Sequence, residues 1–364
     1  MTSLADACAK SAAGVASQPV PESEPCGDKA SSPASCPVRE GVLESSEPLA
    51  LHFGGRLDGL RVAWRLYGPA DAPVVAALGG ISAGRHVADV AGESGWWSEI
   101  VSEGGALDTR RWRILGIDFV GGSHQSTGPE RGQSNFPSIS AYDQVEALRR
   151  VMAHVGIKSL AGIVGASYGG MVALAFAERW PALVQNIVVI SAAHRAHPMS
   201  TAWRSVQRAM VRYALARGDG PEGLRLARAL AMATYRSAQE FDARFDAPPV
   251  RVDGRFQFPV ESYLLARGDA YASTYKPEAF VCLSESIDLH RVEPTRIRTA
   301  TTLVAVREDQ LAPIEDMRAL HASLAGPAEL VEMSSLYGHD AFLKESAILR
   351  DVFARALQPS DGES

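Results

Sequence analysis

The sequence predicts an α/β fold, in which a mostly parallel sheet is covered by helices and carries a helical lid insertion. One observation is a set of short, almost continuously apolar runs, which are typical of strands buried on both faces of a parallel sheet. A second is that helical patterns, notably at residues 141–155, lie between several of these runs, as in α/β folds. The five runs are residues 73–78, 112–117, 160–164, 187–190 and 301–306.

Two earlier segments have a different pattern. Residues 47–53 and 60–67 alternate apolar and polar side chains, as half-exposed antiparallel strands do. Before them, the first 48 residues are rich in Ala, Ser, Pro and Glu and have no apolar periodicity, so we expect a disordered N-terminal extension there. Folded sequence is then expected to begin near Leu49.

The strand pattern stops between residues 191 and 299 and resumes at 301–306 and 329–333. More than a hundred residues between two strands, with helical patterns at 201–217, 221–235 and 260–272, indicate a helical lid. The predicted organisation is a first core part at 49–194, a lid at 195–299, a second core part at 300–358 and a C-terminal tail at 359–364.

Composition narrows the class of protein. The 364 residues carry a formal net charge of −6, which argues against a nucleic-acid partner or an anionic membrane surface. We see no apolar run long enough to span a membrane and no secretory signal pattern. Three of the four cysteines precede residue 37, without a C-x-x-C pair, so we expect free thiols, no metal site and a cytoplasmic protein.

Residues 165–169 read Gly-Ala-Ser-Tyr-Gly, a G-x-S-x-G pentapeptide between an apolar strand and a helical run. This context predicts a nucleophile elbow, in which a sharp turn exposes the Ser167 hydroxyl beside a helix N-terminus. An ordinary strand-to-helix turn is the alternative.

A serine nucleophile needs a base and an acid that orients the base. In the α/β-hydrolase fold they follow the serine in the order acid, then histidine. Asp309 comes directly after the strand at 301–306, and His339 comes after the last strand and follows Gly338. We therefore predict Ser167, Asp309 and His339 as the catalytic residues. Alternatives are Glu308 or a turn-forming role for the acid, and an exposed loop position for His339.

An oxyanion hole requires two backbone N–H donors. Tyr168, directly after the nucleophile, is one candidate, and Ile81 in the Gly79-Gly80-Ile81-Ser82 loop is the other. A purely structural turn is the alternative for that loop. We expect His194 and His197 to lie at the lid hinge or along the pocket.

Several segments together resemble the homoserine O-acyltransferases of methionine biosynthesis and their serine O-acyltransferase relatives. The resemblance runs from about residue 51 to 353. It is carried by the loop at 79–82, the segments at 95–97, 107–112 and 121–129, the lid motifs at 234–237, 241–245 and 258–264, and the ending at 337–343. The lid motifs are the most specific, because generic hydrolases do not share them.

This resemblance implies an acyl-CoA co-substrate, no cofactor and a ping-pong reaction, in which Ser167 takes the acyl group and then passes it to an amino-acid hydroxyl. By resemblance, Arg208 falls where the family binds the carboxylate of the amino acid, and a guanidinium suits a carboxylate. Asp340 falls where the family contacts the amino end. The family also implies a homodimer.

The elbow residues Ala166 and Tyr168, together with Asp118 and Ser123, depart from the common family pattern and leave the acyl donor open. Segments 193–198 and 283–291 resemble a branch that transfers succinyl groups to homoserine, so we favour succinyl-CoA over acetyl-CoA. Arg85 is one candidate partner for the distal carboxylate of a succinyl group. The other hypotheses are a serine acceptor, an esterase that uses water, and a non-catalytic binding module.

Overall fold

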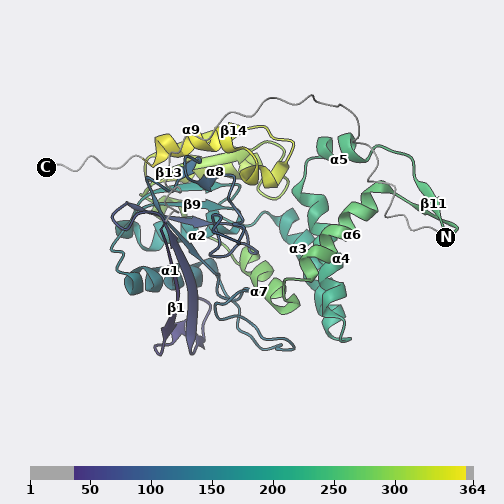
Figure 1. Cartoon of the computed structure of the whole chain (residues 1–364), viewed down its shortest axis with the longest axis horizontal. Helices are drawn as coiled ribbons and strands as arrows, with labels where there is room; N and C mark the ends of the chain where they lie inside the picture. The colour runs from purple at the N-terminus through teal and green to yellow at the C-terminus, as the bar shows by residue number, and fades with distance from the viewer. Residues whose placement is uncertain (1–36, 358–364) are drawn as a thin grey trace, which may run out of the picture. The chain divides into compact units, whose positions relative to one another are not determined.

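The computed structural model describes residues 37–357, and its centre is an eight-stranded sheet with the order β1-β4-β8-β5-β9-β10-β13-β14 (Figure 1). From β8 to β14 every neighbouring pair is parallel, whereas β1–β4 and β4–β8 are antiparallel. The predicted α/β class, with antiparallel strands at its start, is thus confirmed. The strands are β1 (Val38–Ser45), β4 (Leu60–Tyr67), β5 (Val74–Leu78), β8 (Arg113–Ile117), β9 (Leu160–Ala166), β10 (Val184–Ile190), β13 (Ala300–Val306) and β14 (Ala328–Met333).

Helices cover both faces of this sheet. Side chains of α1 (Ala141–Val155), α2 (Tyr168–Arg179) and α8 (Ile314–Ser323) share one buried apolar cluster, and α9 (Ser346–Ala356) belongs to a second cluster. Helix α1 begins at a capping box between Ser140 and Asp143, which satisfies backbone donors of the first turn. These layers fix the carboxyl ends of the parallel strands, where such folds place their functional loops.

The prediction that residues 1–48 form a disordered extension is wrong for its last part. Strand β1 pairs along its whole length with β4, from Val38 opposite Tyr67 to Ser45 opposite Leu60. Most of its side chains are exposed or half-buried because it is the edge strand, so it lacks the apolar pattern of an inner strand. Backbone pairing holds it instead. Residues 1–36 and the predicted tail at 359–364 lie outside the described residues.

The expected strand at 47–53 is also shorter in the structure. Only β2 (Leu49–Ala50) is extended, and it pairs with β3 (Arg56–Leu57). Leu49 in β2 and Leu51 directly after it are buried, so apolar side chains of this segment pack in the core although the strand pairing is short. The remaining short elements are β6 (Val101–Ser102), β7 (Leu107–Asp108) and the 3₁₀ turns η2 (Pro181–Leu183), η3 (Pro294–Arg296) and η4 (Gly338–Leu343).

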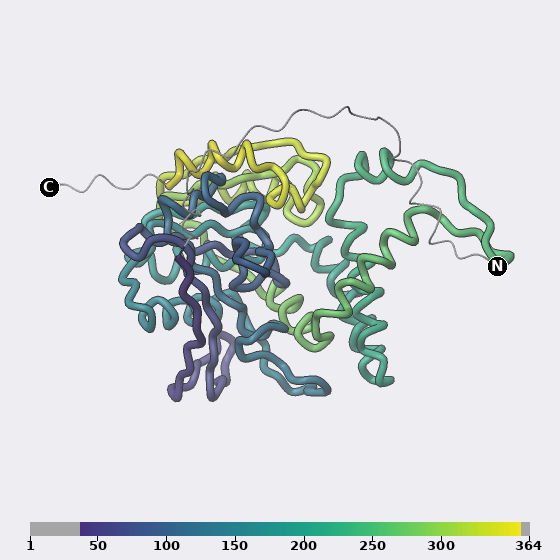
Figure 2. Tube along the Cα trace, in the orientation of Figure 1, coloured from purple at the N-terminus to yellow at the C-terminus, as the bar shows by residue number. Residues whose placement is uncertain are grey.

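Between β10 and β13 the chain forms a mainly helical insertion (Figures 1 and 2). Helices α3, α4 and α7 share the small buried cluster around Val211, Leu224 and Phe280. A hairpin that the sequence did not predict extends away from these helices, and its residues are exposed. The elements are α3 (Pro198–Leu215), α4 (Gly220–Tyr235), α5 (Ala238–Phe245), β11 (Val250–Val252), β12 (Arg255–Gln257), α6 (Pro259–Ala272) and α7 (Pro277–Asp288).

None of the helices within residues 37–357 is both long and apolar enough to cross a membrane.

Candidate active site

Ser167 sits on a strained turn between β9 and α2. Its backbone has φ 55° and ψ −120°, a region that non-glycine residues rarely adopt. The turn is possible because the residues two positions before and after Ser167 are glycines: a Cβ at Gly165 would lie 2.2 Å from the Gly169 carbonyl oxygen, and one at Gly169 would lie 2.2 Å from that of Leu78. The strand, the helix and β5 thus meet in backbone contact, which holds Ser167 at the carboxyl edge of the sheet.

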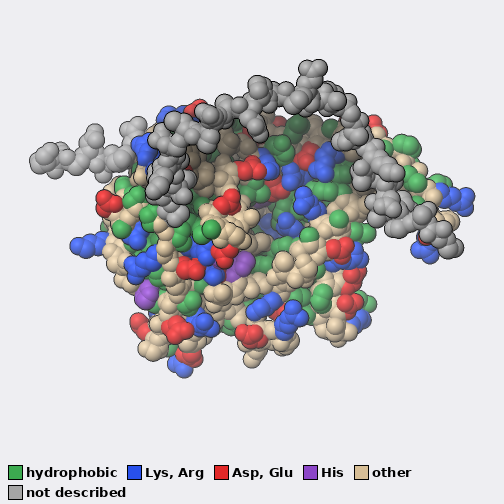
Figure 3. All heavy atoms as spheres, viewed as in Figure 1, with side chains coloured by type: hydrophobic (Ala, Val, Ile, Leu, Met, Phe, Trp, Pro, Cys, Tyr) green, Lys and Arg blue, Asp and Glu red, His purple; other side chains and the backbone are tan. Residues whose placement is uncertain are grey.

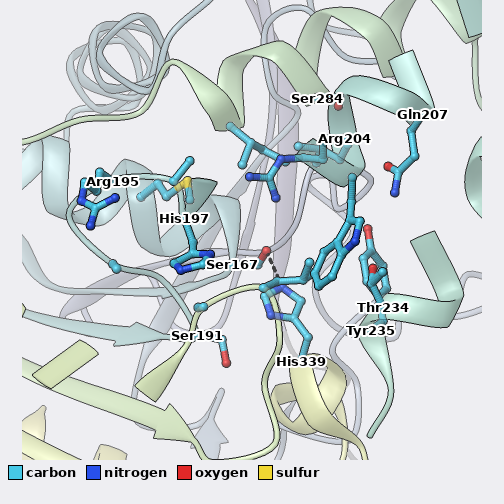
Figure 4. A pocket seen from close by; sticks show the side chains of 18 of the residues that line it. Ser167, Ser191, Arg195, His197, Arg204, Gln207, Thr234, Tyr235, Ser284 and His339 are labelled. Carbon is cyan, nitrogen blue, oxygen red and sulfur yellow. Dashed lines mark hydrogen bonds between the residues drawn. The ribbon is translucent and has the colours of Figure 1, made fainter. Parts of the chain in front are cut away.

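The structure brings Ser167, His339 and Asp309 into one hydrogen-bonded line. His339 Nε2 lies 2.8 Å from Ser167 Oγ (Figure 4), and its Nδ1 lies 2.8 Å from Asp309 Oδ2. With the Nδ1–H donating to the carboxylate, Nε2 is left as an acceptor for the hydroxyl proton. His339 is carried by η4, and only 6% of its surface is exposed. This geometry allows the imidazole to take a proton from Ser167.

Asp309 is held in place by the backbone that follows it. Its Oδ1 accepts hydrogen bonds from the N–H groups of Leu311 and Ala312, at 2.8 and 3.0 Å, which leaves Oδ2 to His339. The alternative acid, Glu308, accepts instead from the backbone N–H of Ser335. The geometry therefore favours Asp309 over Glu308 as the partner of the histidine.

The charges around His339 raise its pKa. Burial alone disfavours the imidazolium and lowers the pKa, but the Asp309 carboxylate, its hydrogen bond and the nearby Asp340 outweigh burial. Arg204 acts in the opposite direction. The result is a pKa above the usual value of 6.5.

A pH profile checks this environment. Because the base must be neutral, the rate should rise with pH through the pKa of His339, so the midpoint of the ascending limb in kcat/KM should lie above 6.5. Asp309→Asn removes the carboxylate charge, so the midpoint should move to lower pH while kcat falls. An unchanged midpoint in Asp309→Asn would show that the carboxylate does not set the protonation of His339.

The predicted oxyanion donors are backbone N–H groups beside the hydrogen-bonded line of Ser167, His339 and Asp309. Neither the backbone N–H of Ile81 nor that of Tyr168 donates to another residue within the described part of the chain. Ile81 lines the cavity above Ser167, and Tyr168 is the first residue of α2. The loop that carries Ile81 is fixed by the insertion, because the Tyr275 hydroxyl donates to the Ile81 carbonyl oxygen and the Ser82 and Tyr271 hydroxyls are hydrogen-bonded.

A cavity lies over Ser167 and His339, between the sheet edge and the insertion (Figure 4). Its walls include Trp203, Arg204 and Gln207 from α3, and Tyr235 from the end of α4. On the face drawn in Figure 3 the surface is hollowed beside the insertion, and Lys and Arg side chains lie there together with Asp and Glu side chains. The cavity lining itself contains Arg195 and Arg204, and cationic groups favour anionic substrates although the chain as a whole is acidic.

The two residues that the resemblance assigned to the amino-acid substrate are both held by other side chains. Arg208 does not line the cavity, and its Nη1 donates to Asp288 and to two oxygens of Ser284. Asp340 follows His339 and lies 3.2 Å from Arg236 Nε. Burial raises the pKa of Asp340, and the charge of Arg236 opposes that effect.

The expectation that Arg85 contacts a succinyl carboxylate is wrong in this structure. The fully buried Asp118 accepts from the backbone N–H of Arg85 at 2.8 Å and from its Nη1 at 2.5 Å. Neither residue lines the cavity. The side chain of Tyr168 likewise points away, since its hydroxyl is hydrogen-bonded to Ser286. The Arg85 guanidinium is already paired with the Asp118 carboxylate, so it is not available to a carboxylate of the substrate.

Arg204 was not among the residues predicted from the sequence, although it lines the cavity. It is one of several arginines on α3, and only the direction of its side chain distinguishes it. His197 was expected along the pocket or at the hinge, and it lines the cavity while its Nδ1 accepts from the Met199 N–H at the start of α3. Residues 37–357 contain no group of three or more His, Cys, Asp or Glu side chains placed to hold a metal ion.

Comparison with known proteins places this chain among α/β hydrolases. The profile described as the alpha/beta hydrolase fold matches residues 77–346. The homoserine O-succinyltransferase of Xanthomonas campestris pv. campestris is 40% identical over 324 residues, covering 88% of this chain and 85% of that protein. The homoserine O-acetyltransferase of Clavibacter michiganensis subsp. michiganensis is 32% identical, covering 88% of this chain and 93% of the relative.

Solved structures agree on the fold. The homoserine O-acetyltransferase from Bacillus anthracis superposes with a TM-score of 0.82 at 16% identity, covering 88% of this chain and 98% of that one. Esterase E22 superposes with a TM-score of 0.79 at 18% identity, covering 88% of this chain and 100% of the esterase, so the architecture alone does not separate hydrolysis from transfer. The sequence relatives make that separation: the chain is an acyltransferase and belongs to the homoserine O-acyltransferase family of the α/β-hydrolase fold.

Proposed function

We propose that this enzyme transfers an acyl group from acyl-CoA to the hydroxyl of L-homoserine, with succinyl-CoA as the preferred donor, and serves methionine biosynthesis. The observation that carries the proposal is the hydrogen-bonded line of Ser167, His339 and Asp309 beneath a cavity that is closed by the insertion. The 40% identity to a homoserine O-succinyltransferase, against 32% to a homoserine O-acetyltransferase, supports the succinyl donor.

In the first half-reaction, Ser167 Oγ attacks the thioester carbonyl carbon while His339 Nε2 takes the hydroxyl proton. The negative oxygen of the tetrahedral intermediate is stabilised by the N–H groups of Ile81 and Tyr168. The C–S bond then breaks, His339 returns the proton to the leaving sulfur, and CoA departs as a thiol. An ester to Ser167 remains.

In the second half-reaction, His339 takes the proton of the acceptor hydroxyl, whose oxygen attacks the ester carbonyl of the acyl-enzyme. The same two N–H groups stabilise the second intermediate, and Ser167 leaves with the proton that His339 returns. Asp309 keeps its Oδ2 toward Nδ1 in both halves and stabilises the imidazolium each time. No metal or cofactor takes part in this sequence.

A thiol-release assay tests the proposal by crossing succinyl-CoA and acetyl-CoA with L-homoserine and L-serine. We expect the highest kcat/KM for succinyl-CoA with L-homoserine, and CoA release in the presence of acceptor that is faster than thioester hydrolysis. A highest value with L-serine would instead assign serine as the acceptor, as the name of a relative from Litchfieldella anticariensis, a serine O-succinyltransferase at 32% identity, suggests. No turnover with any pair would contradict the proposal.

We further propose that the enzyme acts in the cytoplasm as a homodimer. The exposed apolar side chains of the insertion, including Val250, Phe256 and Phe258 of the hairpin region, support a contact between two copies. The free, buried thiol of Cys282 agrees with a reducing compartment. Light scattering in solution should give twice the chain mass of 38.8 kDa, and a single-chain mass would contradict the dimer.

A further inference from the structure

Two arginines on α3 share one carboxylate. Arg204 and Arg208 are four residues apart and therefore lie on the same face of the helix. Asp288, at the end of α7, faces both: its Oδ1 lies 2.8 Å from Arg204 Nε and 2.7 Å from Arg204 Nη2, and its Oδ2 lies 2.5 Å from Arg208 Nη1. The three side chains are each about 10% exposed. Two guanidinium groups against one carboxylate leave one positive charge without a counter-ion inside this cluster.

The two arginines differ in which of their guanidinium nitrogens already donate hydrogen bonds. Arg208 Nη1 also donates to the carbonyl and hydroxyl oxygens of Ser284, and Nη2 donates to Ser205 Oγ. Arg204 uses only its Nε and Nη2 on Asp288, and its Nη1 donates to no acceptor among residues 37–357. Arg204 therefore keeps one terminal nitrogen, Nη1, for a further acceptor, whereas both terminal nitrogens of Arg208 already donate.

Arg204 also faces the reacting atoms. It lines the cavity over Ser167 and His339, whereas Arg208 does not. In Figure 4 the Arg204 guanidinium extends from α3 toward the Ser167 hydroxyl. The charge of Arg204 is also felt at His339, where it acts to lower the pKa of the imidazole. Arg204 and Ser167 therefore face the same cavity, where a carboxylate of the substrate would be accessible to this guanidinium.

The other arginine along the cavity has a partner of its own. Arg195 Nη2 lies 3.8 Å from Asp316 Oδ1, and Asp316 also lines the cavity, so these two charges offset one another. Arg204 is left as the cation with capacity for an anionic ligand.

We propose that Arg204, positioned by Asp288, binds a carboxylate of the substrate, either the distal carboxylate of a dicarboxylic acyl donor or the α-carboxylate of the amino-acid acceptor. A guanidinium edge forms paired hydrogen bonds to a carboxylate in either case. Asp288 then acts as a positioning residue, and Arg208 keeps Asp288 in place. The inference rests on the proposed function and names the residue of that site that selects the substrate.

The test uses Arg204→Gln in the full chain with two pairs of substrates that differ by a carboxylate. The donor pair is succinyl-CoA and butyryl-CoA, compared by the rate of CoA release without acceptor. The acceptor pair is L-homoserine and 3-aminopropan-1-ol, compared by kcat/KM with a fixed donor. We expect Arg204→Gln to lower the rate for the carboxylate-bearing member of one pair about 30-fold more than for its neutral counterpart. The affected pair identifies which carboxylate is bound.

Arg212→Gln is the matched control, because Arg212 is on the same helix, has a 56% exposed side chain and lies outside this cavity. Arg204→Gln leaves Asp288 paired with Arg208, so no buried charge is stranded, and Arg204→Lys, which keeps the charge, should recover part of the selective loss. Equal losses for both members of both pairs, or the same selective loss in Arg212→Gln, would overturn the role of Arg204.

The results distinguish a wrong assignment of Arg204 from a wrong proposed function. Wild-type transfer to either amino acid, combined with no selective loss in Arg204→Gln, leaves the acyltransferase function standing and removes only the assignment to Arg204. A wild-type protein that releases no CoA from any donor, with or without acceptor, overturns both.

Discussion

Replacing His339 with alanine should lower kcat for CoA release by at least about 10³-fold, because the variant lacks the imidazole that takes the Ser167 proton. Asp309 is not a direct substitute, because the imidazole, to which it is hydrogen-bonded at 2.8 Å, separates it from Ser167. The residual rate would come from substrate binding and from the two backbone donors of the oxyanion hole.

The measurement is the steady-state rate of CoA release with the preferred donor and acceptor. His154→Ala is a suitable control, because His154 is an exposed residue near the end of α1 and lies outside the cavity. Both variants should give the far-ultraviolet circular dichroism spectrum of the wild type. If His339→Ala kept more than a tenth of the wild-type kcat, His339 would not be the base.

Gly169→Ala should destabilise the fold by at least about 3 kcal/mol, because the added methyl group has no room. Its Cβ would lie 2.2 Å from the carbonyl oxygen of Leu78 and 2.4 Å from the carbonyl carbon. Both atoms belong to the backbone of β5, so no rotation of a side chain relieves the contact. Either β5, an inner strand of the sheet, or the start of α2, which follows the neighbouring strand β9, must shift.

The free energy of unfolding, measured by urea denaturation, checks this expectation. Gly80→Ala is the matched control, since a Cβ at Gly80 meets no atom within 4 Å and its φ is not in the left-handed region. We expect Gly80→Ala to unfold within about 0.5 kcal/mol of the wild type. A Gly169→Ala protein as stable as Gly80→Ala would show that β5 and the elbow are not in rigid contact.

Much of this site was predictable because its residues are tied to strand ends. Ser167 and Asp309 each follow a buried apolar run, and His339 follows the last strand, so the parallel topology alone brings them to one edge of the sheet. The order of the three residues along the chain is the further signal. The inner strands were equally predictable, because a strand that is buried on both faces has a continuous apolar run in the sequence.

The features that the sequence did not reveal depend on contacts between distant segments. Arg204 and Arg208 lie on the same helix face, and both pair with Asp288, 80 or more residues later. Only the direction of the Arg204 side chain, which lines the cavity, separates their roles. Arg85 was misjudged for the same reason, because its partner Asp118 comes from another strand end. Strand β1 was missed because an edge strand held by backbone pairing carries little apolar pattern.

The hydroxyl contacts of Tyr271 and Tyr275 connect the insertion to the loop at Ile81 and Ser82, so the insertion cannot be replaced independently of that loop. Tyr275 donates to the Ile81 carbonyl oxygen and Tyr271 is hydrogen-bonded to Ser82, so the loop that presents the Ile81 N–H rests on residues almost 200 positions later in the chain. A shortened enzyme that joined β10 directly to β13 would lose both supports. Exchange of lids between relatives therefore has to carry the matching residues of this loop with it.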